Sequence, residues 1–367
     1  MRRNLPAYLA EFAGTALMLF FGVSAVSFLW GAGSPVPVNW NPVIHRLLSA
    51  MLFAGGATAV VYSPLGQRSG GHLNPAITLA FWKAGKVPTR DAVIYGVVQL
   101  VGGLLGAYAA GAAWGPQTAR VRFAATLPGP GYSLAGVLAV EIFVTFLLVF
   151  TIFACVNKPR LAPKSGLIAG ILMSILVTMG APVSGASLNP ARTFGPAVMS
   201  SSYHALWIYF AGPGLGALLA VAAYRGQWGP DVVCAKLFHT ASYPCPFETC
   251  NYRLVSAGET VMEAGDPGDE AYVVERGALE VRRGSLVGTN AVSLARLGPG
   301  DWVGEMSLLL DEPRSATVVA ATDAQLRRVT KQDMGHVLAE DPQRTEELLR
   351  QLARRVKATN ERVAGRT

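Results

Sequence analysis

The chain carries Asn-Pro-Ala twice, 115 positions apart, first as Asn74, Pro75 and Ala76 and again as Asn189, Pro190 and Ala191. Asn is a preferred N-cap and Pro is tolerated at the first helical position, so each tripeptide predicts the start of a helix. A helix that begins inside a membrane directs unpaired N–H groups and the positive end of its dipole at whatever lies there. Two such ends facing each other would admit neutral hydrogen-bonding solutes and repel cations.

Charge is distributed unevenly along this hydrophobic chain, which is 51% hydrophobic with a mean hydropathy of +0.35. Residues 1–230 hold 14 Lys/Arg and 3 Asp/Glu, whereas residues 231–367 hold 17 and 20. The net charge of +8 therefore belongs to the apolar part, where membrane topology explains it better than nucleic-acid binding does. We expect a lipid bilayer, and not a nucleic acid, as a partner.

Six segments are long and apolar enough to cross a bilayer, which takes about 20 residues. They lie near residues 7–30, 43–64, 91–113, 133–156, 165–183 and 204–226. Three spans in each half is an odd number, so the two halves would be inverted repeats whose Asn-Pro-Ala loops meet at the midplane. The alternation of Lys/Arg between loops predicts a multi-pass protein of the cell (inner) membrane with both termini cytoplasmic.

Two carboxylates, Glu11 and Glu141, occupy equivalent places in the first and fourth spans. A carboxylate within a span costs roughly 2.5–3.5 kcal/mol on insertion scales. One interpretation is a proton relay. The other, which we favour, is that each carboxylate accepts hydrogen bonds from the irregular loop before its Asn-Pro-Ala, whose backbone has no water to bind.

The loops Ser69–Thr78 and Ser184–Ala197 closely resemble the two signature loops of the aquaporin, or major intrinsic protein, family. This resemblance covers about residues 5–226 and implies six transmembrane helices, two half-helices and a homotetramer. By the family's pattern the outer constriction would consist of Ala54, Val177, Ala186 and Arg192. Arg192 would bind a solute oxygen and repel cations.

Small residues at Ala54 and Val177 depart from water-selective members, which have a bulky aromatic residue and a His there. They resemble plant nodulin-26-like and bacterial metalloid channels, which pass glycerol, urea, boric acid or arsenous acid. Four other positions look like those of water channels, namely Thr193, Ala197, Tyr209 and Phe210. The resemblance thus implies passage of water and of small neutral solutes.

Residues 227–252 contain several Pro residues and no long apolar run, so we expect a linker. The chain's cysteines are predicted to be reduced thiols rather than metal ligands, because their spacing is loose and His partners are missing: Cys155, Cys234, Cys245 and Cys250. From about 253 to 330, short alternating runs punctuated by Gly and Asp indicate a small antiparallel β-roll. Residues 335–363 have helical spacing.

Within the β-roll, a carboxylate and an arginine flank a short turn and helix, with Glu305 on one side and Arg314 on the other. Arg can hold a cyclic phosphate while a carboxylate accepts from a ribose hydroxyl. The stretch from 253 to 363 closely resembles the cyclic nucleotide-binding domain, that of the bacterial catabolite activator in particular. The resemblance implies a ligand site at Gly304, Glu305, Met306, Arg314, Ser315, Ala316 and Thr359.

By the same resemblance Thr359 would contact adenine and favour cAMP, while Ser315 leaves cGMP possible. No helix-turn-helix follows in this sequence, so a DNA-binding role is not expected. We therefore expect a channel in residues 1–226 and a soluble nucleotide-binding domain in residues 253–367 that regulates it. The alternatives are a membrane-anchored nucleotide sensor or scaffold, and a constitutive channel with a non-regulatory appendage. No catalytic or metal-binding constellation stands out, so no enzyme and no cofactor are predicted.

Overall fold

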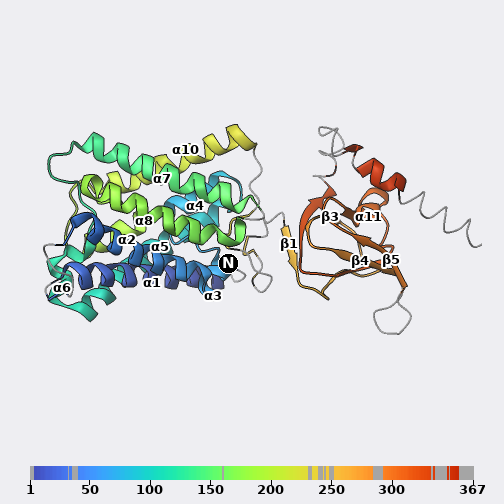
Figure 1. The fold of residues 1–367 in the computed structure, drawn as a ribbon, viewed down its shortest axis with the longest axis horizontal. Helices are drawn as coiled ribbons and strands as arrows, with labels where there is room; N and C mark the ends of the chain where they lie inside the picture. The colour runs from blue at the N-terminus through green and yellow to red at the C-terminus, as the bar shows by residue number, and fades with distance from the viewer. Residues whose placement is uncertain are drawn as a thin grey trace, which may run out of the picture. The chain divides into compact units, whose positions relative to one another are not determined.

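The computed structural model describes residues 4–31, 33–34, 40–158, 161–229, 234–238, 243, 245–247, 252–283, 292–331, 334, 345–346 and 348–354. The chain forms two compact units, Met1–Cys250 and Asn251–Thr367, of which the first is helical and the second consists mainly of strands (Figure 1). Each unit is described separately below.

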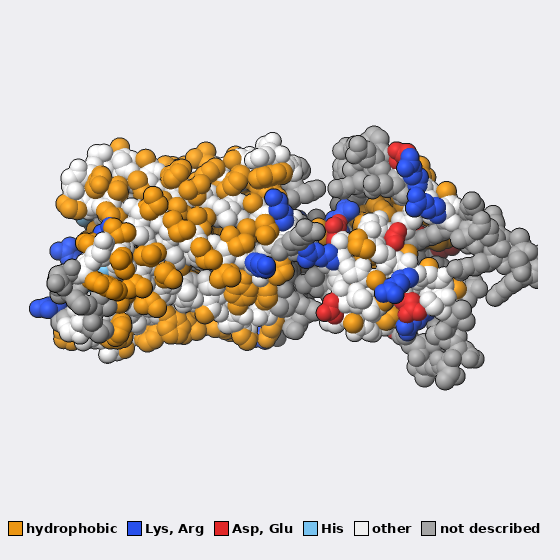
Figure 2. Space-filling model, viewed as in Figure 1, with side chains coloured by type: hydrophobic (Ala, Val, Ile, Leu, Met, Phe, Trp, Pro, Cys, Tyr) orange, Lys and Arg blue, Asp and Glu red, His pale blue; other side chains and the backbone are white. Residues whose placement is uncertain are grey.

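Among the described residues of the first unit, six helices are long and apolar enough to cross a membrane, as predicted. They are α1 (Leu5–Trp30), α2 (Pro42–Tyr62), α5 (Thr89–Trp114), α7 (Leu134–Val156), α8 (Ser165–Ser184) and α10 (Ile208–Trp228). Hydrophobic side chains cover the visible flank of this unit (Figure 2). Shorter helices are α3 (Pro64–Ser69), α6 (Pro116–Arg120) and the two half-helices α4 (Pro75–Lys83) and α9 (Pro190–Met199).

Glycine allows the long helices to pack backbone against backbone at equivalent places in the two halves. A Cβ atom at Gly106 of α5 would lie 2.2 Å from the carbonyl oxygen of Ala16 on α1. A Cβ atom at Gly216 of α10 would lie 2.4 Å from the carbonyl oxygen of Ile142 on α7. Even Ala would therefore force these helices apart, as expected for small residues at helix contacts in membranes.

The described residues of the second unit form two four-stranded antiparallel sheets, with strand orders β1-β8-β3-β6 and β2-β7-β4-β5. The strands are β1 (Tyr252–Val255), β2 (Thr260–Met262), β3 (Glu270–Arg276), β4 (Leu279–Arg283), β5 (Val292–Leu297), β6 (Trp302–Val303), β7 (Thr317–Ala320) and β8 (Ala324–Thr330). Short helix α11 (Glu305–Leu310) follows β6. Lys and Arg mix with Asp and Glu on the visible surface of this unit (Figure 2).

A helical stretch near the C-terminus packs on this unit. Residues 345–346 and 348–354 are helical, and the side-chain amide of Gln351 hydrogen bonds both the N–H and the carbonyl of Trp302. Leu348 is buried beside Trp302 and Leu308. The rest of the predicted helix at 335–363, Thr359 included, lies outside the described residues.

Candidate functional site

The two Asn-Pro-Ala loops meet inside the helical unit and bind each other. Asn74 Nδ2 donates to the carbonyl of Leu188 at 2.9 Å, and Asn189 Nδ2 donates to the carbonyl of Leu73 at 2.9 Å. The Oδ1 atom of Asn74 accepts from the N–H of Ala76 and so caps α4. Asn189 caps α9 in the same way. The predicted N-caps are confirmed, and the two half-helices begin at one shared point.

Glu11 supports the backbone of the first loop. Its carboxylate is fully buried and accepts from the N–H groups of His72 at 2.9 Å and Leu73 at 2.8 Å. Ser69 Oγ and Gln99 Nε2 donate to the same carboxylate at 2.7 and 2.8 Å. Every donor here belongs to the loop or to the neighbouring α5. The hydrogen-bonding interpretation of Glu11 is therefore confirmed. These bonds account for the buried carboxylate without a proton relay.

Glu141 repeats this arrangement in the second half. It is fully buried and accepts from the N–H groups of Ser187 at 2.9 Å and Leu188 at 3.1 Å, and from Ser184 Oγ at 2.7 Å. The symmetry extends to two tyrosines whose loop-bracing role the sequence reasoning missed. Tyr95 donates to the carbonyl of Ser69, and Tyr209 donates to that of Ser184, each at 2.7 Å.

Arg192 directly follows the second Asn-Pro-Ala and is held in a fixed position. Its Nη1 donates to the carbonyl of Ala124 at 2.6 Å, and its guanidinium carbon lies 5.0 Å from the centre of the Phe53 ring. A guanidinium over an aromatic face is an attractive arrangement. A charge-bearing group thus projects beside the second loop, next to an aromatic ring.

Phe53 of α2 faces Arg192, and its neighbour Ala54 has different surroundings. The Phe53 ring fills the space beside Gly22 of α1, where a Cβ atom would lie 2.3 Å from the ring. Ala54 is 2% exposed, and its carbonyl oxygen lies 3.7 Å from the position of a Cβ atom at Gly170 on α8. Successive residues of a helix point about 100° apart around its axis. Phe53 and Ala54 therefore contact different neighbouring helices although they are adjacent in sequence.

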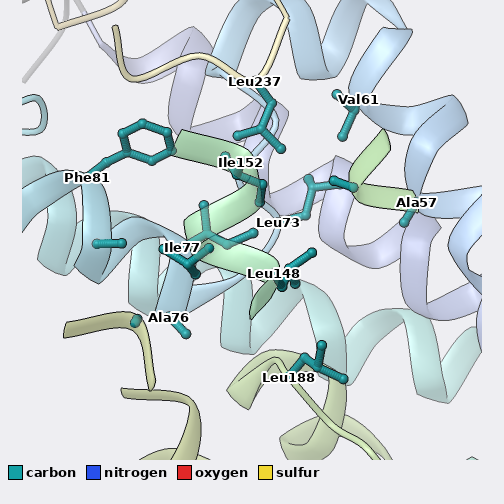
Figure 3. Close-up of a cluster of buried hydrophobic side chains, with 14 of the residues drawn as sticks. Ala57, Val61, Leu73, Ala76, Ile77, Phe81, Leu148, Ile152, Leu188 and Leu237 are labelled. Atoms are coloured by element: carbon teal, nitrogen blue, oxygen red, sulfur yellow. The ribbon is translucent and has the colours of Figure 1, made fainter. Parts of the chain in front are cut away.

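A cavity of about 60 Å³ extends along one side of the paired asparagines. Asn74, Asn189 and Leu237 all line it, although Leu237 falls in the segment predicted as a linker. Figure 3 shows Leu237 in the same cluster as Val61, Leu73 and Ile152. At about 10–15 Å³ for each water, the cavity can hold a short file of water molecules.

The second unit holds a pocket built around Arg314, which is 7% exposed. Arg314 Nη1 donates to the carbonyl of Gly304 at 3.0 Å, and Nη2 donates to the carbonyl of Glu270 at 2.6 Å. Gly304 has φ +78°, and a Cβ atom there would lie 2.5 Å from Arg314 Nη1. Six of the predicted residues line the pocket, namely Gly304, Glu305, Met306, Arg314, Ser315 and Ala316, while the seventh, Thr359, lies outside the described residues.

Comparisons with known proteins now identify both units. The sequence model of the major intrinsic protein family matches residues 2–224, and that of the cyclic nucleotide-binding domain matches residues 252–341. The chain belongs to the major intrinsic protein family. Its helical unit is an integral membrane channel domain of this family, and its second unit is a cyclic nucleotide-binding domain.

Relatives of this major intrinsic protein include archaeal and plant aquaporins. Aquaporin AqpM of Methanothermobacter marburgensis is 36% identical over 59% of this chain and 95% of its own length. Aquaporin NIP1-4 of Oryza sativa is 35% identical over 60% of this chain and 76% of its own length. The solved aquaglyceroporin of Plasmodium falciparum shares the fold, with a TM-score of 0.52 at 18% identity, over 63% of this chain and 97% of its own.

These relatives are channels, not enzymes. Among the residues that the structure describes, no group of three or more His, Cys, Asp or Glu side chains could hold a metal ion.

Proposed function

We propose that this protein is a channel for water and small neutral solutes whose conductance is regulated by cAMP bound to its soluble domain. The observation that carries the pore is the reciprocal pairing of Asn74 with Leu188 and of Asn189 with Leu73. The Oδ1 atom of each asparagine accepts a hydrogen bond as the cap of its half-helix, and one amide hydrogen is donated to a carbonyl of the opposite loop. The second amide hydrogen is available to a solute oxygen.

We infer an outer constriction formed by Phe53, Val177, Ala186 and Arg192. Phe53 replaces Ala54 in the set expected from the sequence, because its ring contacts the Arg192 guanidinium. Ala186 lies in the second loop beside α8. A Cβ atom added at Gly180 of α8 would lie 3.2 Å from the Cβ atom of Ala186. An aromatic ring narrows this constriction, whereas Val177 and Ala186 keep it apolar. Water and slim neutral molecules such as glycerol are the solutes that suit it.

For the soluble domain we propose cAMP as the ligand, with cGMP as a weaker alternative. Arg314 would bind the cyclic phosphate together with Ser315, and Glu305 would accept from the ribose hydroxyl. The Thr359 contact with adenine stays a prediction. We further propose a homotetramer in the cell (inner) membrane with both termini and the nucleotide domain cytoplasmic, as the Lys/Arg distribution of the loops indicates.

The decisive experiment is stopped-flow light scattering of proteoliposomes that contain the whole protein, with and without saturating cAMP. We expect osmotic shrinkage faster than in empty liposomes, entry of glycerol, and a several-fold change in permeability with cAMP. Coupling energies of about 1–3 kcal/mol correspond to roughly 5- to 150-fold. Arg314→Ala should abolish the response to cAMP and leave the basal flux unchanged.

The two alternative functions give different results in this assay. A nucleotide sensor or scaffold would bind cAMP without raising permeability above that of empty liposomes. A constitutive channel would conduct equally with and without cAMP, even in protein shown to bind it by calorimetry.

A further inference from the structure

A short segment beyond α10 returns to the pore. Residues Cys234 to Phe238, here called the plug segment, are predicted from sequence to be part of a linker. Leu237 N donates to the carbonyl of Gly70 at 2.9 Å, and His72 Nε2 bonds the carbonyl of Ala235 at 2.6 Å. The carbonyl of Leu237 accepts from Ser165 Oγ at the start of α8. The segment is thus hydrogen bonded to the first pore loop and to a helix of the other half.

Burial shows that the plug segment is inserted between these elements and does not lie on their surface. Ala235 and Lys236 are fully buried, Cys234 is 1% exposed and Leu237 is 4% exposed. Leu237 lines the same 60 Å³ cavity as the asparagines of both Asn-Pro-Ala motifs. In Figure 3 its side chain lies with Val61, Leu73 and Ile152. An aliphatic side chain of the plug segment therefore forms part of the wall of the cavity at the paired asparagines.

The hydrogen bonds of the plug segment use groups that a permeating solute would need. A pore conducts neutral solutes by offering them donors and acceptors in place of water. Here the carbonyl of Gly70 is bonded by the N–H of Leu237, and His72 is bonded by the carbonyl of Ala235. A water molecule at this mouth would meet apolar carbon in place of these partners, and water needs two to four polar partners in a buried site.

Two side chains of the plug segment have further partners in this unit. The ring of Phe238 lies 4.6 Å from that of Tyr62 on α2. The ammonium group of Lys236 donates to the carbonyl of Tyr243 at 2.5 Å. Burying an ammonium group costs free energy even when it is hydrogen bonded, so this side chain lowers the stability of the docked state.

We propose that Cys234–Phe238 is an intrachain plug that closes one mouth of the pore, and that its release opens the channel. This inference rests on the proposed channel function. The nucleotide-binding domain begins at residue 252, 14 positions after Phe238, so a movement of that domain acts on the plug through a short connection. Nucleotide binding is then the release signal.

The test compares full-length variants in proteoliposomes by stopped-flow light scattering. Leu237→Asp places a charge in the apolar mouth and should expel the plug, because an unpaired carboxylate is costly to bury. Leu237→Met keeps an apolar side chain of similar size. Leu349→Asp makes the same change at a position that is 58% exposed, in the soluble unit. Should Leu237→Asp fail to fold, replacement of residues 234–238 by five Gly and Ser residues takes its place.

Trypsin cleavage after Lys236, identified by mass spectrometry of the purified protein, reports independently whether the plug is docked. We expect at least fivefold higher water permeability and rapid cleavage for Leu237→Asp, and wild-type values for the other two variants. Saturating cAMP should raise both quantities in the wild type. Equal permeability of wild type and Leu237→Asp, despite cleavage at Lys236, would refute the plug and leave the channel function standing. Permeability of all variants equal to that of empty liposomes would overturn the channel function and the plug together.

Discussion

Replacing Arg314 with Ala tests the nucleotide site most directly. The side chain is 7% exposed, and the carbonyls of Gly304 and Glu270 fix its guanidinium in the pocket. A hydrogen bond to a charged group contributes about 1.5–3 kcal/mol, and each 1.4 kcal/mol is about tenfold in affinity. Loss of the phosphate contact should therefore weaken cAMP binding roughly 10- to 150-fold in titration calorimetry. Arg314→Lys should restore part of the affinity, because it keeps the charge without the planar fork.

A second variant displaces the guanidinium without altering it. The Cβ atom of Gly304→Ala would lie 2.5 Å from Arg314 Nη1, so affinity should fall although the arginine is retained. Gly300→Ala is the matched control, since Gly300 has φ +92° but nothing lies within 4 Å of a Cβ atom there. Both variants place Ala in a left-handed backbone conformation and carry the same kind of strain. Only Gly304→Ala also clashes with Arg314. Wild-type affinity in Gly304→Ala, or equal losses in both, would contradict the assigned role of Arg314.

Three further predictions concern the channel. Phe53→Ala should raise glycerol permeability relative to water, while Ala54→Gly should leave the ratio unchanged; the reverse result would restore Ala54 to the constriction. Glu141→Gln removes a charged acceptor from two backbone N–H groups and should lower the free energy of unfolding by about 1.5–3 kcal/mol, measured by chemical denaturation in detergent. Mercurials should not block the outer constriction, because Ala186 carries no thiol; inhibition that persists in a cysteine-free variant would show that the thiol argument is wrong.

Local chemistry in the sequence was sufficient to predict much of this protein. Asn followed by Pro caps a helix wherever it occurs, so the starts of both half-helices could be read from Asn74 and Asn189. The length and apolarity of the spans follow from bilayer thickness. The role of Glu11 and Glu141 followed as well, because irregular backbone inside a membrane requires hydrogen-bond partners. The change in charge after residue 230 separated the channel from the soluble domain.

Two features were decided by the tertiary structure alone. Phe53 and Ala54 are adjacent in sequence, and only the rotation of α2 against its neighbours determines which of them meets Arg192. Leu237 lies in a short irregular segment without periodicity or cap, so nothing local distinguishes it from an ordinary linker residue. Its partners, Gly70, His72 and Ser165, are distant in sequence. Helix starts and membrane spans depend on neighbouring residues, whereas the lining and closure of a pore depend on which distant surfaces the fold brings together.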